Sequence, residues 1–101
     1  MTREERQQLI KDDMEYHMEE FNLSEEEAQD VVADNYILGY LASRISEEDL
    51  LGLMEAMGYS IEIEKLREER QKRAKLKAYR KELRARHKKE RETMKAKKEV
   101  I

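Results

Sequence analysis

Apolar side chains recur at helical spacing along the first part of the chain. Over residues 3–20, Ile10, Met14 and Met18 are four residues apart and Phe21 follows three later, which predicts a helix with one narrow apolar stripe. Over residues 25–44 the apolar residues cover most of a helical circumference; they are Ala28, Val31, Val32, Tyr36, Ile37, Leu38, Tyr40 and Leu41. We therefore predict that this second helix lies at the centre of a bundle.

Two more helices are predicted after it. Residues 47–57 carry Leu50, Leu51, Leu53, Met54 and Met57, and Gly58 is expected to end this helix in a left-handed conformation. From Ile61 to Lys98 there is no glycine, proline or turn cluster, which predicts one long helix whose first turns join the bundle. The predicted fold class is all-α: a small bundle of three N-terminal helices followed by one long, highly basic C-terminal helix that extends beyond the bundle.

Helix starts are marked by three capping sequences. Each has a hydroxyl at the N-cap and a carboxylate three residues later: Thr2 with Glu5, Ser24 with Glu27, and Ser46 with Asp49. We expect each cap to contribute about 1 kcal/mol, with Asp49 the poorer fit because its side chain is shorter. Gly39 costs about 1 kcal/mol relative to alanine inside a helix, so we expect a close helix crossing there.

One short segment resembles a known family. Leu53–Tyr59 is similar to the Met-Gly-Phe/Tyr turn of ubiquitin-associated domains through Met57, Gly58 and Tyr59. In those domains the turn follows a short helix, contributes to the binding surface and precedes two further short amphipathic helices. Because a long charged segment follows here, we interpret the turn as an ordinary glycine C-cap.

Charge is distributed unevenly along the chain. Charged residues make up 45% of the 101 residues and hydrophobic ones 39%, so much of the chain must be solvated surface. Residues 1–64 hold 4 basic and 18 acidic side chains, a net −14, and residues 65–101 hold 17 basic and 6 acidic, a net +11. We predict an acidic helical head over residues 1–64 and a basic extended helix or tail over residues 65–101.

The residue types needed for catalysis and metal binding are sparse. There is no cysteine, no glycine-rich phosphate loop and no nucleophile beside a base, and we predict no enzyme, no catalytic residue and no cofactor. His17 and His87 lack the paired spacing of a metal site, so we predict no bound metal and interpret His17 as a residue at the edge of the core. No apolar run reaches membrane-spanning length and the first residues lead into no apolar signal region, so we expect a cytoplasmic protein without membrane contact.

The basic helix is the main candidate for function. Its apolar residues thin to Leu76, Tyr79 and Leu83, spaced three and four apart on one face. We predict a partner-binding site that consists of Leu76, Tyr79, Arg80, Lys81, Leu83 and Arg84. The first hypothesis is a small adaptor, inhibitor or assembly chaperone that holds a protein partner through this face, through the acidic head, or through both.

Three alternatives remain open from the sequence. The basic helix is also suited to nonspecific binding of DNA or RNA, although Tyr79 is its only aromatic residue and no base-reading motif surrounds it. The opposite charges of the two halves also suit head-to-tail pairing into a homo-oligomer, and an acidic head can imitate nucleic acid. A cysteine-free, methionine-rich helical chain is what we expect of a bacterial or phage accessory gene.

Overall fold

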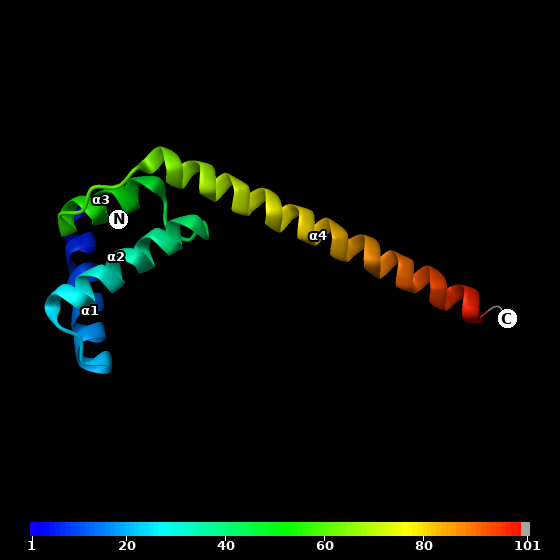
Figure 1. Cartoon of the computed structure of the whole chain (residues 1–101), viewed down its shortest axis with the longest axis horizontal. Helices are drawn as coiled ribbons and strands as arrows, with labels where there is room; N and C mark the ends of the chain where they lie inside the picture. The colour runs from blue at the N-terminus through cyan, green and yellow to red at the C-terminus, as the bar shows by residue number, and fades with distance from the viewer. Residues whose placement is uncertain (100–101) are drawn as a thin grey trace. The chain divides into compact units, whose positions relative to one another are not determined.

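The computed structural model describes the backbone of residues 1–99 and the side chains of residues 1–95. These residues form four helices and no strand, in the order α1 (Arg3–Phe21), α2 (Glu25–Leu41), α3 (Glu47–Met57) and α4 (Ile63–Glu99) (Figure 1). The predicted all-α class, with three shorter helices followed by one long C-terminal helix, is confirmed.

The chain divides into two compact units. The first unit is Met1–Arg70, and the second begins at Gln71, so α4 contributes to both. The acidic head and basic helix of the sequence analysis are defined by charge and divide after residue 64. The first unit ends later because Ile63 and Leu66, in the opening turns of α4, pack against its core.

The core of the first unit is centred on α2. Each of α1, α2 and α3 packs against the other two. Of the nine buried apolar residues among those described, α2 supplies six: Ala28, Val32, Ala33, Tyr36, Tyr40 and Leu41. Leu50, Leu53 and Met54 come from α3, while α1 contributes only partly buried side chains such as Ile10 and Met14. The central position predicted for the second helix is confirmed, because most of the buried apolar residues among those described belong to it.

Several apolar residues of the predicted stripes are exposed instead of buried. Val31 and Leu38 lie on the face of α2 opposite Val32 and Tyr36, and both are open to solvent. Met18 and Phe21, at the end of α1, are exposed as well. The reason is that only one side of each helix faces the rest of the bundle, so an apolar residue elsewhere on the circumference stays in water.

The end of α2 comes three residues earlier than predicted. The helix stops at Leu41, and Ser43 adopts a left-handed conformation with φ 60°. The amides of Arg44 and Ile45 both donate to the carbonyl of Gly39, at 2.8 and 3.2 Å, so the chain turns back on the last helical turn. At Gly39, a Cβ would lie 2.7 Å from Cδ1 of Ile45. The close approach predicted at Gly39 is therefore made by the following loop and not by another helix.

The helix caps follow the sequence closely. Thr2, Ser24 and Ser46 each accept from the amide three residues later. The reciprocal bond is made in the second cap, where the Ser24 amide donates to the Glu27 carboxylate at 3.3 Å. In the third cap the Asp49 carboxylate instead accepts from the N-terminal amine at 3.1 Å. Gly58 ends α3 with φ 81° and ψ 20°, as predicted for a glycine C-cap.

Candidate partner-binding surface

The predicted partner-binding residues all lie on α4 within the second unit. A helix turns by about 100° per residue, so Leu76, Tyr79 and Leu83 fall on one face, here named the apolar stripe of α4. Leu76 is 47% exposed and Tyr79 58% exposed, while Leu83 is half-buried. The apolar stripe of α4 is therefore largely open to solvent in the single chain.

The three basic candidates differ in their position around the helix. Arg80 follows Leu76 by one turn and lies beside the apolar stripe. Arg84 lies at its flank, and Lys81 lies on the opposite face, because its place in the sequence turns it away from Leu76 and Leu83. All three side chains are exposed. The helix thus brings Arg80 to the apolar stripe but not Lys81.

The second unit carries a dense positive charge. Residues 71–95 contain 12 basic and 3 acidic residues, a net +9. Glu82 pairs with Arg86 one turn later, with 3.1 Å between Oε1 and Nη2. Such an exposed pair contributes only a few tenths of a kcal/mol and neutralises a small part of the charge. An approaching partner therefore meets a field that favours carboxylates or phosphates.

Within the first unit, polar contacts hold the first turns of α4 against α2 and α3. The Arg67 guanidinium donates from Nε and Nη2 to the two carboxylate oxygens of Glu47, with 2.8 Å between Nη2 and Oε2. These bonds hold the pKa of Glu47 below its ordinary value. Arg70 lies 4.7 Å above the ring centroid of Tyr40, and its Nε donates to Ser43 at 3.2 Å.

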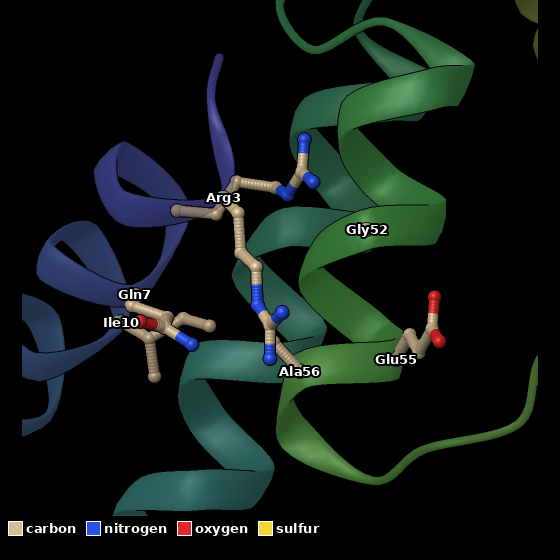
Figure 2. A pocket seen from close by; sticks show the side chains of 7 residues that line it. Arg3, Gln7, Ile10, Gly52, Glu55 and Ala56 are labelled. Atoms are coloured by element: carbon tan, nitrogen blue, oxygen red, sulfur yellow. The ribbon is translucent and has the colours of Figure 1, made fainter.

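A cavity between α1 and α3 is a feature that the sequence analysis missed. It has a volume of about 550 Å³ and is lined by Arg3, Arg6, Gln7, Ile10, Gly52, Glu55 and Ala56. Figure 2 shows Gln7 and Ile10 of α1 facing Gly52 and Ala56 of α3. The signal in the sequence was the pair Arg3 and Arg6, which are two of only four basic residues before residue 65.

The cationic groups of this cavity are partly engaged within the chain. Arg6 donates to the carbonyl of Met1 at 2.9 Å and lies 3.9 Å from the Asp49 carboxylate. A Cβ at Gly52 would lie 2.5 Å from Nε of Arg6, so the glycine makes room for the guanidinium. Glu55 adds a negative charge to the same lining. The lining therefore mixes the two guanidiniums of Arg3 and Arg6 with one carboxylate, and Arg6 is already held by contacts within the chain.

A polar cluster joins α1 to α2 at the edge of the core. The Tyr36 hydroxyl donates to the Asp13 carboxylate at 2.6 Å. His17 Nδ1 lies 2.8 Å from the Asp13 carbonyl, and His17 Nε2 lies 3.4 Å from the Asn35 amide nitrogen. Burial, together with the hydrogen bond to Asp13, raises the pKa of Tyr36 well above its ordinary value. His17 thus occupies the edge-of-core position predicted for it.

The Tyr36 to Phe substitution tests this cluster. Tyr36→Phe should lower the free energy of unfolding by about 1.5 kcal/mol, because a hydrogen bond to a charged carboxylate is removed. Since the folded pKa is raised, the contribution of the phenol is complete below the ordinary tyrosine pKa of about 10 and declines as the pH rises above it. Urea titrations at pH 7 and above pH 10 measure both effects. Tyr16→Phe, at an exposed position, is the control, and an equal loss in the two variants would contradict the assignment.

Three further searches bear on these surfaces: for a metal site, for a membrane-spanning helix and for similar known proteins. Among the residues that the structure describes, no group of three or more histidine, cysteine or acidic side chains is placed to hold a metal ion. None of the helices in the described part combines the length and the apolar character needed to cross a membrane. No protein-family model, curated protein or solved structure matches the chain.

Proposed function

We propose that this chain is a non-enzymatic interaction protein that binds another protein through the apolar stripe of α4 and the basic side chains near it. The observation that carries this proposal is the exposure of Leu76 and Tyr79 on one face of a helix whose other positions are mostly charged. A helix that binds its partner through charge alone needs no apolar face, whereas a helix that docks in a groove of a protein does. Adaptor, inhibitor and assembly chaperone are the kinds of protein that fit this proposal.

The energetics favour apolar residues as the anchors of such a contact. Full burial of a leucine or aromatic side chain is worth about 1.5–3 kcal/mol, whereas an exposed charge pair contributes about 0–1 kcal/mol. Leu76, Tyr79 and Leu83 span two helical turns, a length that fits a short groove. Arg80 lies beside them and is suited to a carboxylate at the rim of the groove.

Nonspecific binding of DNA or RNA is the second candidate function. It is favoured by the net +9 of residues 71–95, which suits a phosphate backbone. Tyr79 is exposed and offers a surface on which one base can stack. This function does not require Leu76 or Leu83, and that difference separates the two candidates.

The test is affinity capture, in which the purified full chain is the bait and a nuclease-treated lysate of cells that naturally make it supplies the partner. We expect the wild-type chain to retain a defined protein partner, and Leu76→Ala combined with Leu83→Ala to release most of it. Leu51→Ala is the matched control, because Leu51 is an exposed leucine in α3 of the first unit. Disappearance of all captured protein on nuclease treatment, or equal capture by the leucine variant, would contradict the proposal.

A further inference from the structure

A second exposed apolar face lies on α2. Val31 is 37% exposed and Leu38 52% exposed; they are seven residues apart and share a helical face. Glu27 and Asp34 lie on the same face, between and beside the two apolar residues. This set, here named the acidic stripe of α2, consists of Glu27, Val31, Asp34 and Leu38. It faces away from the core residues of the same helix.

The surroundings of this stripe are strongly negative. Helix α2 contains five acidic residues and no basic one. Asp30, next to the stripe, accepts a hydrogen bond from the Tyr59 hydroxyl at 2.7 Å. This bond raises the pKa of Tyr59, and the charges of Asp34 and Glu26 add to the effect. The face therefore presents carboxylates around two exposed apolar side chains.

The two stripes match in spacing and are opposite in charge. Val31 and Leu38 are seven residues apart, and so are Leu76 and Leu83. Asp34 lies between the first pair, three residues after Val31, and Arg80 lies between the second pair, three residues before Leu83. Helices pair side by side when apolar residues recur at this heptad spacing and when the flanking charges are complementary. With the two helices antiparallel, Asp34 and Arg80 fall opposite each other.

We propose that the acidic stripe of α2 in one copy of the chain binds the apolar stripe of α4 in a second copy. This inference rests on the proposed function, because it names a partner for the same α4 surface. The argument for a second copy is the complementarity itself: one sequence carries both an acidic apolar face and a basic apolar face with equal spacing. Each copy offers one face of each kind, so the contact is made twice in a closed dimer or repeats along a chain of copies.

Sedimentation velocity of the purified, nuclease-treated full chain tests the proposal. At about 50 mM salt we expect association that increases with protein concentration and disappears at about 500 mM salt, because the charges are then screened. Leu38→Ala should weaken association about tenfold, since an apolar anchor of the contact is removed. Leu51→Ala, which lies on neither stripe, should leave it unchanged.

A charge exchange tests the pairing of the two stripes directly. Asp34→Lys and Arg80→Glu should each weaken association, and the double variant should restore it, because an opposite-charge pair is formed again. Circular dichroism should show unchanged helix content, since both residues are exposed. A chain that stays monomeric at all concentrations, a change independent of concentration, or a double variant no better than the singles would overturn the inference.

The failures of the two proposals are distinguishable. A monomeric chain that still captures a protein in a manner dependent on Leu76 and Leu83 overturns the second-copy inference and leaves the proposed function intact. A chain that associates through Leu38 and Leu83 yet captures no other protein supports the inference and limits the function to self-assembly.

Discussion

Leu50→Ala should lower the free energy of unfolding of the chain by about 2–5 kcal/mol. Leu50 is completely buried among residues of α2 and α3, so its truncation removes apolar packing and leaves a cavity in the core. The first unit is small and its core has nine buried apolar residues among those described, so one such loss is a large part of its stability.

The neighbouring leucine provides the control. Leu51 occupies the same helix and is 41% exposed, so Leu51→Ala should change the free energy of unfolding by less than about 1 kcal/mol. Both substitutions have the same effect on helix propensity, and the difference between them therefore reports burial. Urea unfolding followed by circular dichroism measures it. Equal losses in the two variants would show that the packing of α3 differs from that described.

The boundaries of α3 show what sequence reasoning predicts well. The helix was predicted over residues 47–57 and is observed over Glu47–Met57. Both ends depend on local chemistry, because Ser46 caps the first turn with its hydroxyl and Gly58 adopts a left-handed φ without a steric penalty. Such signals need no knowledge of what lies elsewhere in the fold.

The second helix was predicted to run to residue 44 but ends at Leu41, and Leu38, one of the apolar residues used to place this helix at the centre of the bundle, is exposed. The turn after Leu41 is closed by two amides that donate to the Gly39 carbonyl. The segment contains no glycine or proline that would predict a turn at this point. The apolar residues of α2 itself cover most of its circumference. Their periodicity alone therefore did not distinguish the buried Leu41 from the exposed Leu38. A cost of about 2–5 kcal/mol is expected for Leu41→Ala and not for Leu38→Ala.

Of the two candidate surfaces, the apolar stripe of α4 was predicted from the sequence and the acidic stripe of α2 was not. Leu76, Tyr79 and Leu83 stand out in a charged segment, so their shared face was visible from spacing alone. Val31 and Leu38 were counted among the apolar residues that place the second helix at the centre of the bundle, where apolar residues are usually buried. Their exposure, and with it the acidic stripe of α2, becomes visible only when the packing of α1 and α3 is known.

The second large effect is expected at the apolar stripe of α4. Leu76→Ala combined with Leu83→Ala should weaken binding to a protein partner by about tenfold for each leucine, because apolar anchors dominate the binding of a helix in a groove. Alanine keeps the helix, so the weaker binding reports the missing side chains and not unfolding. Fluorescence anisotropy of the labelled full chain against the captured partner measures the dissociation constant.

If nucleic acid is the target, charge reversal of Arg80, Lys81 and Arg84 to glutamate should weaken binding more than the leucine substitutions do. Binding to a duplex of mixed sequence should then fall, and the slope of log affinity against log salt should flatten by about 0.9 for each phosphate that is no longer neutralised. The leucine variant should bind the duplex nearly as the wild type does. We expect the protein pattern, in which the leucine substitutions weaken binding more than the charge reversals.

The positions of Arg80 and Lys81 sharpen the comparison. Arg80 lies beside the apolar stripe of α4 and Lys81 lies on the opposite face. A protein groove that holds the stripe contacts the first and leaves the second in solvent, so Arg80→Ala should weaken partner binding several-fold while Lys81→Ala should not. A phosphate backbone attracts both charges through the same field, so the two variants should then show similar decreases in duplex affinity. Tight, salt-sensitive duplex binding with equal decreases at Arg80 and Lys81, unaffected by the leucine substitutions, would place the chain among nucleic-acid-binding proteins.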